Sequence, residues 1–455
     1  MKEIEEYVAA LGLDAYLVGG AVRDELLGRE TKDADFLVPG ISSDALRRAL
    51  ETHGRVEELV VAGKPVGMRL YARTRAIREL APAGIEFAPV RRERSTGPGR
   101  HDFEIVVDPS AGVEDDLARR DFTINALARR LSDGVLVDPH GGRSDLARGV
   151  LRTVTPRSFA EDPLRAVRGL RFVSQLGFDL DPTTLDEMRE AADGVRRVSG
   201  ERIGGGLAAD GMGELSKLLL GANPRKALRF ARDTGVLVAL LPEFEPAIGF
   251  DVHSQDHTLP LDEHTFAVVQ AAADAAAPLR VRLATVFHDL GKPLTPEGGD
   301  HAAVAAPIAD RALRRLRYPN DLRERAVRIV KHHPFLLGPG DALEARRMLA
   351  TYGDELAFDL LAHWNADIRG RDPGPKTDEK LARLARFRET LEQELPSPHR
   401  LSDLAVNGTD LMELGYEAGP RLGRALAELL DEVVETPDLN SREALLARAR
   451  ELLHA

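Results

Sequence analysis

The spacing of apolar and polar residues changes near residue 140 of this 455-residue chain. Before that point, short apolar runs bounded by Gly, Pro or charged residues predict strands. The predicted strands are Tyr16–Val18, Phe36–Val38, Val66–Tyr71, Ile85–Pro89 and Phe103–Val107. From about Leu151 onward, apolar residues recur three and four positions apart, which predicts helices. The pattern therefore indicates an α/β head with a small mixed β-sheet, followed by an all-α remainder.

Four domains are expected, because a chain of this length is too long for one core and because loops rich in Gly and Pro interrupt the helical pattern. Residues 1–140 form the α/β head, and residues 141–250 form a helical neck and body. Residues 251–395 form a second helical domain, and residues 396–455 form a helical tail.

The composition narrows the class of protein and the kind of site. The chain has no cysteine, so disulfides are excluded and any metal must bind to His, Asp or Glu. The net charge of -12 argues against a protein that is basic overall, although a local basic face for RNA is compatible with it. No apolar run approaches the roughly 18 residues of a membrane span, and the N-terminus carries acids where a signal peptide carries bases. We therefore expect a soluble, cytoplasmic protein.

The stretch from Tyr16 to Phe36, YLVGGAVRDELLGRETKDADF, combines a bare turn with charged groups. Two glycines ending at Gly20 lie between a predicted strand and a predicted helix, where backbone N–H groups and Arg23 can receive a phosphate. If the next strand includes Asp33 and Asp35, its period of two puts both carboxylates on one face, where Mg²⁺ can lie between them. Either piece alone is more often a turn or a solvated loop. Together, at this spacing, they indicate a nucleoside triphosphate with magnesium.

Four motifs in the first 180 residues resemble, in order, those of one nucleotidyltransferase family. GGAVRD followed by DADF resembles motif A of the branch that holds bacterial tRNA CCA-adding enzymes and poly(A) polymerases. LARRDFTINALA (Leu117 to Ala128) resembles the second motif, VDPHGGRSDL the third and EDPLRAVRGLRF (Glu161 to Phe172) the fourth. The segment from Leu404 to Ala449 is also similar to the C-terminal segment of those tRNA enzymes. The resemblance implies nucleotide transfer to an RNA 3′ end, with tRNA, CTP and ATP as partners and a tail that offers a tRNA contact.

The resemblance also implies which residues perform this chemistry. Asp33 and Asp35 would bind two catalytic Mg²⁺ ions, one for the attacking 3′-hydroxyl and one for the leaving pyrophosphate. The residues expected to hold the nucleotide are Gly20, Arg23 and Arg120, with Asp121 and Asn125 close to its sugar and phosphates. Glu86 stands where family members often have a third catalytic acid, and a structural acid paired with Arg91 or Arg92 is an equally good interpretation.

The fourth motif can be interpreted from its residues alone. Asp162 and Arg165 are three apart in a predicted helix and so share a face, which Arg168 and Arg171 extend. A carboxylate beside a guanidinium can accept from the exocyclic amine of C or A and donate to a ring acceptor, a pattern that U and G do not match. The further arginines can neutralise a triphosphate. A solvated arginine-rich helix is the plain alternative, which the preceding motifs disfavour.

A second group of candidate residues lies in the helical part. Adjacent His and Asp in FHDLGKP follow an apolar helix, and further His and Asp occur on flanking helices, which is a donor set for a transition metal or magnesium. The set resembles the HD phosphohydrolase family, whose pattern implies His264, His288, Asp289 and Asp367 as metal ligands. His301 and His332 match additional histidines of many members, with His333 as the alternative to His332. A degenerate HD fold kept for its shape is disfavoured because no expected ligand is missing.

The two resemblances together favour a template-independent CCA-adding tRNA nucleotidyltransferase with an attached HD metal phosphohydrolase acting on phosphoesters or RNA ends. Poly(A) polymerase is less favoured, because VAGKPVGMRLYAR replaces the basic stretch that such enzymes usually show after motif A. A specialist that adds only C or only A is harder to exclude, although the loop from Arg91 to His101 looks intact. From another class, an HD nucleotide phosphohydrolase with a nucleotide-binding regulatory head stays open. So do the HD metal, its substrate and the number of subunits.

Overall fold

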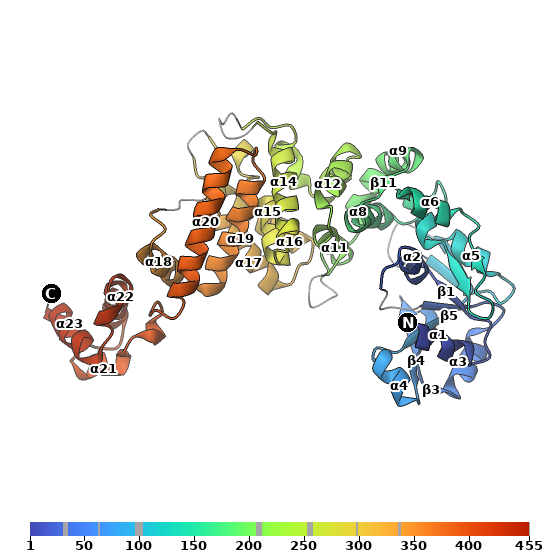
Figure 1. The fold of residues 1–455 in the computed structure, drawn as a ribbon, viewed down its shortest axis with the longest axis horizontal. Coiled ribbons are helices and arrows are strands. Elements are labelled where there is room, and N and C mark those ends of the chain that lie inside the picture. Colours follow the sequence, from blue (N-terminus) through green and yellow to red (C-terminus); the bar gives the residue numbers. More distant parts are fainter. Residues whose placement is uncertain are drawn as a thin grey trace. The chain divides into compact units, whose positions relative to one another are not determined.

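The computed structural model describes residues 1–30, 35–61, 64–95, 103–205, 212–252, 258–296, 299–334 and 338–454. These form two compact units, Met1–Glu245 with Arg315–Pro319, and Pro246–Arg314 with Asn320–Ala455. The first unit contains the α/β head and the helices that follow it, and the second is helical throughout its described residues (Figure 1). The mixed β-sheet head followed by a helical part is therefore confirmed. The unit boundary near residue 245 lies close to the predicted domain boundary at residue 250.

The head is built on a seven-stranded sheet in which β2 holds a central place. The strand order is β3 (Gly54–Val61), β4 (Lys64–Ala72), β5 (Ile85–Pro89), β2 (Asp35–Val38), β1 (Tyr16–Val18), β8 (Ala128–Arg130) and β9 (Leu136–Val137). Strand β2 runs antiparallel to β1 and parallel to β5, with Asp35 opposite Glu86 and Phe36 opposite Phe87. The sheet thus brings two acids that are far apart in the sequence to the same end of neighbouring strands.

Each of the five predicted strands is present, and others were not predicted. Strand β6 (Arg91–Ser95) pairs antiparallel with β7 (Phe103–Val107) in a separate two-stranded sheet. The segment from Arg91 to His101, expected to be a loop, therefore begins as a strand, while its residues 96–101 lie outside the described part of the chain. The sequence RRERS has no apolar residue, so backbone pairing rather than a hydrophobic pattern defines this strand.

Apolar residues on one face of the sheet form a core with the helix after β7. Tyr16, Val18, Leu37 and Leu117 belong to this cluster, and Leu117 lies on α5 (Val113–Ala118). Because side chains alternate along a strand, Asp35 lies on the same face as Leu37, at the end of β2. The head also contains α1 (Lys2–Ala9), α2 (Gly20–Leu26), α3 (Ser43–Glu51) and α4 (Arg75–Leu80).

The rest of the first unit is mainly helical and is organised around α8 (Leu164–Leu176), which packs against α11 (Glu214–Leu219) and α12 (Pro224–Asp233). The other helices are α6 (Gly142–Arg148), α7 (Ser158–Glu161), α9 (Pro182–Ala191), α10 (Gly200–Gly204) and α13 (Val236–Leu240). A short parallel pair is formed by β10 (Val150–Leu151), which precedes α7 and α8, and β11 (Asp179–Leu180), which follows them.

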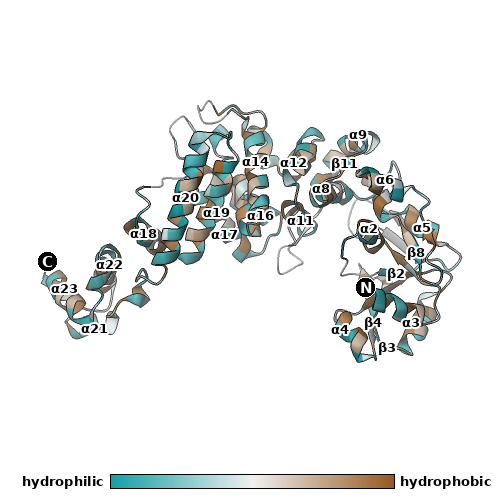
Figure 2. Ribbon diagram, in the orientation of Figure 1, coloured by the Kyte–Doolittle hydropathy of each residue, from teal (hydrophilic) through white to brown (hydrophobic). Residues whose placement is uncertain are grey.

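In the second unit, α14 (Leu261–Asp274) packs against α15 (Leu279–Phe287) and α19 (Asp354–Arg369), and α15 packs against α17 (Asn320–His332). The unit also contains α16 (His301–Arg315), α18 (Ala342–Tyr352) and α20 (Pro375–Glu394). Figure 2 shows α20 as mostly hydrophilic, in keeping with a single apolar stripe whose buried members are Leu384, Phe387 and Leu391.

The C-terminal helices have a hydrophobic core of their own. Leu411 of α21 (Gly408–Glu413), Leu429 of α22 (Pro420–Glu435) and Leu445 of α23 (Arg442–His454) are buried together. Nowhere in the described chain is there a helix with both the length and the apolar content that a membrane crossing requires.

Candidate active site and candidate metal centre

Asp35 and Glu86 line a cavity of about 200 Å³ in the head, together with side chains of the α5 region that include Arg119 and Arg120. Glu86 accepts a hydrogen bond from Arg69 Nη2 at 2.5 Å. Arg91, one expected partner of Glu86, instead donates to the backbone oxygen of Val66 at 2.9 Å. Asp33, the other predicted magnesium ligand, lies outside the described residues.

The glycine turn is shaped by its first glycine. Gly19 has φ +72°, and a Cβ added there would lie 2.5 Å from Nη1 of Arg120. Gly20, which was predicted to contact the nucleotide, is the first residue of α2. A side chain at this position would therefore displace the Arg120 guanidinium, and the positive φ also favours glycine.

Arg120 is held by an acid that the motif analysis did not name. Asp116 is fully buried and accepts hydrogen bonds from Arg120 Nη2 at 3.0 Å and from Arg119. Burial opposes ionisation of Asp116, but the two guanidinium groups outweigh it and lower its pKa. Its spacing of three and four residues from Arg119 and Arg120 on α5 and the following turn is the signal that could have identified it.

Predicted nucleotide-binding residues from the first, second and fourth motifs form one hydrogen-bonded chain. Arg23 Nη1 donates to Asn125 Oδ1 at 2.8 Å, and Asn125 Nδ2 donates to Asp121 Oδ1 at 3.0 Å. Arg168 Nε donates to Asp121 Oδ2 at 2.8 Å. Burial opposes ionisation of Asp121, yet Arg168 and the hydrogen bonds lower its pKa. The Asp121 carboxylate thus holds Arg168 directly and Arg23 through Asn125.

Three of the predicted arginines also surround one aromatic ring. The guanidinium carbons of Arg23, Arg168 and Arg171 lie 5.2, 5.8 and 4.4 Å from the centre of the Phe172 ring. Arg171 Nε lies 3.2 Å from an oxygen of Glu214, a buried acid that the sequence analysis did not single out. Phe172 and Glu214 thus stabilise a group of three arginines that come from the first and fourth motifs.

The prediction that Asp162 and Arg165 share a helix face is wrong. Helix α8 begins at Leu164, and Asp162 precedes it with φ -142° and ψ 99°. The cause is Pro163, because a residue before proline is driven from helical to extended conformations. Asp162 accepts from Arg202 Nη2 at 2.8 Å, whereas Arg165 donates to Ser158 Oγ at 3.0 Å.

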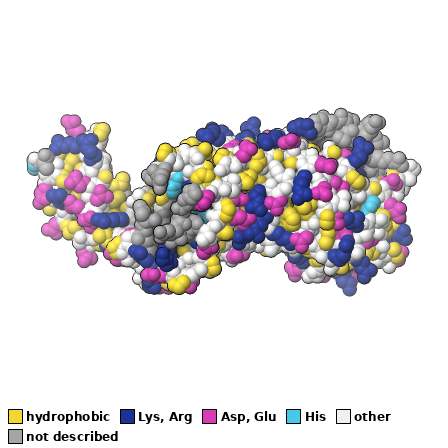
Figure 3. All heavy atoms as spheres, turned by 90° about the horizontal axis from the view of Figure 1, so that it is seen from above, with side chains coloured by type: hydrophobic (Ala, Val, Ile, Leu, Met, Phe, Trp, Pro, Cys, Tyr) yellow, Lys and Arg dark blue, Asp and Glu magenta, His cyan; other side chains and the backbone are white. Residues whose placement is uncertain are grey.

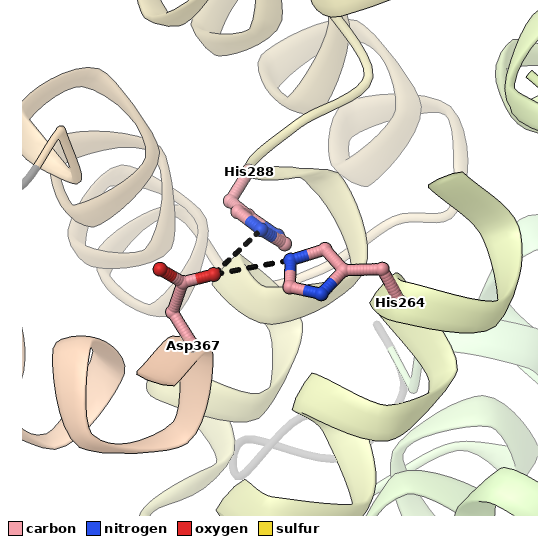
Figure 4. A group of neighbouring side chains, drawn as sticks. All are labelled: His264, His288 and Asp367. Carbon is pink, nitrogen blue, oxygen red and sulfur yellow. Dashed lines mark hydrogen bonds and ion pairs between the residues drawn. The ribbon is translucent and has the colours of Figure 1, made fainter. Parts of the chain in front are cut away.

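The second unit brings His264, His288 and Asp367 together from three different helices (Figure 4). His264 lies on α14, His288 ends α15 and Asp367 lies on α19. Oδ1 of Asp367 lies 3.1 Å from Nε2 of His264 and 3.7 Å from Nε2 of His288. All three side chains are buried, and one ligand atom from each lies within 4.8 Å of the others, so the first triad can hold a metal ion.

Asp289, His301 and His333 form a second triad beside the first. Oδ1 of Asp289 lies 3.3 Å from His301 Nε2 and 3.5 Å from His333 Nε2, while its Oδ2 lies 3.1 Å from His288 Nε2. One carboxylate therefore faces both triads. The prediction that favoured His332 is corrected to His333: the ring of His332 packs on Tyr352, with 5.1 Å between ring centres.

Three of the four histidines of the triads are oriented by the backbone. Nδ1 of His264, His288 and His333 lies 3.3, 2.9 and 2.7 Å from the backbone oxygens of Gly370, Thr285 and Val330. A carbonyl oxygen only accepts, so Nδ1 carries a proton and Nε2 is left to face the carboxylates. Metal-binding histidines commonly use the same arrangement, in which the nitrogen away from the metal donates to a backbone oxygen.

The charges of the cluster also fit a cation. Burial opposes the charged form of His288, but Asp289 and Asp367 outweigh it and raise its pKa to about 9. Despite burial, the neighbouring histidines hold the pKa values of both carboxyl groups well below their usual range. A metal ion can take the place of the His288 proton between these carboxylates. Imidazole and carboxylate donors without thiolate suit divalent transition ions.

Three residues around this cluster were missed by the sequence analysis. Lys292 Nζ donates to Asp289 Oδ2, and Arg371 Nη2 donates to Asp367 Oδ2, each at 2.6 Å. His363 is fully buried, with its ring centre 5.1 Å from that of His288 and 5.6 Å from that of His333. Their spacings, three or four residues from Asp289 or Asp367, are the helical neighbour signal that could have found them.

Three parts of the chain match known families. Residues 15–152 match "Poly A polymerase head domain", residues 177–248 match "Probable RNA and SrmB- binding site of polymerase A", and residues 307–449 match tRNA nucleotidyltransferase domain 2. The last match spans most of the second unit, including α17, α19 and the tail.

Relatives that match over most of the chain, and one solved structure, extend these family matches. The multifunctional CCA protein of Chromobacterium violaceum is 36% identical over 400 residues, which cover 82% of this chain and 90% of that protein. The multifunctional CCA protein of Xanthomonas campestris pv. campestris is 34% identical over 469 residues, covering 96% of this chain and 99% of that protein. The crystal structure of the Bacillus stearothermophilus CCA-adding enzyme in complex with CTP matches with a TM-score of 0.70 and 26% identity, covering 99% of this chain and 96% of that one.

Proposed function

The chain belongs to the family of the multifunctional CCA proteins, class II CCA-adding enzymes, and we propose that its two sites perform two separate reactions. The head adds C, C and A from CTP and ATP to the 3′ end of tRNA without a template. The histidine–aspartate cluster hydrolyses phosphoesters, with damaged RNA ends as its substrate class. Both substrates belong to the cytoplasm, where we propose the enzyme works.

The observation that carries the head reaction is the β2–β5 register, which sets Asp35 opposite Glu86 beside a cavity that Arg119 and Arg120 also line. Asp35, with Asp33 of the same motif and Glu86 as the third acid, would hold Mg²⁺. When bound, such ions lower the pKa of an attacking hydroxyl and stabilise charge on pyrophosphate. Arg69 contacts Oε1 of Glu86, so Oε2 would be the oxygen offered to a metal ion.

The arginines beside the acids would bind the triphosphate. Arg23 and Arg168 are anchored through Asn125 and Asp121, so their guanidinium groups are already oriented when the nucleotide arrives. A preoriented cation loses less side-chain entropy on binding than a flexible one does. Burial lowers the pKa of Arg171 despite the nearby Glu214, and an added phosphate would stabilise its charged form.

Selection of C and A is assigned to Asp162 and Arg165. Arg202 holds the Asp162 carboxylate from one side, and Ser158 and the backbone oxygen of Arg119 hold Arg165. Both groups are only partly buried, so an incoming base edge can compete for the remaining lone pair and N–H. The acceptor, Asp162, therefore lies on an extended segment before α8, whereas the donor, Arg165, lies on α8 itself.

RNA binding is compatible with the net negative charge of the chain. On the face seen in Figure 3, Lys and Arg side chains gather in several places among Asp and Glu. The match of residues 177–248 to an RNA-binding family supports RNA contact by the helices after the head. Poly(A) polymerase is the second candidate because the head matches that family, but the relatives that match 96% and 82% of the chain are CCA proteins.

Hydrolysis at the cluster would use the two triads as the metal-binding residues. When bound, divalent ions polarise a phosphoester and lower the pKa of water. Lys292 donates to Oδ2 of Asp289 and Arg371 donates to Oδ2 of Asp367, which keeps these carboxylates ionised and brings positive charge to the site. A cavity of about 440 Å³ is lined by Arg371, Lys376 and Lys380, among other residues. Its positive charge favours a phosphate-bearing substrate.

The test incubates the purified full chain with tRNA lacking its 3′ end and with CTP and ATP, separately and together, followed by sequencing of the product. We expect two C residues with CTP alone and CCA with both. Addition of only C, of only A, or of an unlimited A tail from the complete mixture would each contradict the assignment. A second assay with an RNA ending in a 2′,3′-cyclic phosphate tests the cluster, and no hydrolysis with any divalent metal would reject that half.

A further inference from the structure

His363 is the buried residue around the cluster for which the triads provide no role. Its side chain is fully buried on α19. Within the described part of the chain, neither of its ring nitrogens has a hydrogen-bond partner. A buried polar group without a partner destabilises a protein, so an imidazole with two such nitrogens requires an explanation.

The position of His363 points to the metal centre. It precedes Asp367 by four residues on α19 and therefore lies on the same face of that helix, one turn away. Its ring approaches His288 of the first triad and His333 of the second, at 5.1 and 5.6 Å between ring centres. His363 thus adjoins both triads, with Asp289 as the carboxylate that faces both.

The hydrogen bonding of its neighbours separates His363 from them. In His264, His288 and His333, the backbone fixes Nδ1 and leaves Nε2 for a ligand. In His363, no such bond has to be broken for either nitrogen to turn toward an ion. A metal ion would therefore give one of these nitrogens a partner without the loss of an existing hydrogen bond.

We propose that His363 is an additional nitrogen ligand of the metal centre. The proposal rests on the metal-hydrolase role assigned to the cluster. The described cluster with His363 contains five imidazoles and two carboxylates, and nitrogen donors suit Co²⁺, Ni²⁺ or Zn²⁺, whereas Mg²⁺ prefers oxygen. The ligand class is therefore a nitrogen-preferring divalent cation.

The test measures metal binding directly. Metal-free full-length protein is titrated with Co²⁺, the visible absorption of the bound ion is recorded, and bound cobalt per chain is measured after dialysis. We expect His363→Leu to weaken Co²⁺ binding about tenfold or more and to change the absorption spectrum. We also expect it to leave the Tm of the metal-free protein equal or higher, because leucine fills similar volume without unpaired nitrogens.

His332→Leu is the matched control, because that histidine adjoins His333 in the sequence while its ring lies on Tyr352. It should retain the wild-type Co²⁺ affinity and spectrum. If His363→Leu does not fold, His363→Gln serves in its place, since it keeps a polar side chain of similar size. Wild-type affinity and spectrum in a folded His363 variant would overturn this proposal alone. Wild-type protein that binds no Co²⁺ would overturn both this proposal and the hydrolase assignment.

Discussion

The two sites hold their acids in opposite environments. Asp35 of the head is exposed at the end of a strand, beside guanidinium groups. Asp289 and Asp367 of the cluster are only 3% and 8% exposed, among imidazoles. An exposed carboxylate costs little when no metal is present, so the head can wait for magnesium that arrives with a nucleotide. Buried carboxylates need a permanent counter-charge, so the cluster is suited to a resident ion.

The two scaffolds differ in the same way. In the head, parallel pairing of β2 and β5 sets the spacing of Asp35 and Glu86, while one side of the site faces a cavity. In the second unit, three packed helices enclose the ligands, and each Nδ1 bond to the backbone fixes a ring. An open site suits an RNA end that must enter and leave, whereas an enclosed set of ligands suits a bound ion.

The largest expected effect comes from removing one acid of the head. Asp35→Asn keeps the shape of the side chain but removes the charge that would bind magnesium, so nucleotide addition should fall about 1,000-fold or more. Hydrolysis at the cluster should change less than about twofold, because that site lies on other elements. The measurements are addition of labelled CTP to tRNA and hydrolysis of a cyclic-phosphate RNA.

Asp289→Asn is the reciprocal control, and it should leave addition intact while hydrolysis is lost. Loss of both activities in either folded variant would mean that the two sites are not separate.

Metal removal should separate the sites by the ion that restores them. After treatment with a chelator and its removal, millimolar Mg²⁺ should restore nucleotide addition at once. Hydrolysis should stay about tenfold or more below its original rate in Mg²⁺ and return with Co²⁺, Ni²⁺ or Zn²⁺. The measurement is each rate against added ion. Equal recovery of both activities in Mg²⁺ would contradict the contrast between an open oxygen site and a closed nitrogen-rich one.

The smallest effect is a pH dependence of stability in the metal-free protein. Asp289 and Asp367 raise the pKa of His288 from its ordinary 6.5 to about 9 in the folded state, despite burial. Its stabilising contribution is therefore complete below pH 6.5 and is lost as the pH rises through 9, by at most about 3 kcal/mol. Calorimetry between pH 6.5 and 9.5 should show the Tm of the metal-free protein falling.

Two controls sharpen this prediction. His288→Asn should remove most of the decline, and saturation with metal should do the same, because the ion replaces the proton. The head offers a contrast, since the pKa of Asp121 is lowered and its contribution is constant across this range. A pH-independent Tm in the metal-free wild type would contradict the charge arrangement assigned to His288.

Local sequence was enough for much of the fold and of both sites. The apolar period predicted the helical part after Leu151, which contains α8, α14 and α22, and the motifs placed Asp35 in a strand and His288 with Asp289 at the end of an apolar helix, which is α15. Strand β6 could not be predicted, because its residues are polar and its partner β7 supplies the pairing. The spacing of Asp162 and Arg165 predicts one helix face, but Pro163 keeps the residue before it out of the helix.

What the sequence determined by itself is whatever depends on residues within a few positions of one another: element type, the glycine turn, and which residues carry chemistry. What only the tertiary structure decided is which of them meet. Asp116 anchors Arg120, His333 rather than His332 joins the second triad, and His363 adjoins both triads. His332 and His333 are adjacent and chemically identical, so the sequence alone does not distinguish them. The direction of a side chain at the end of a helix is set by the residues that pack around it.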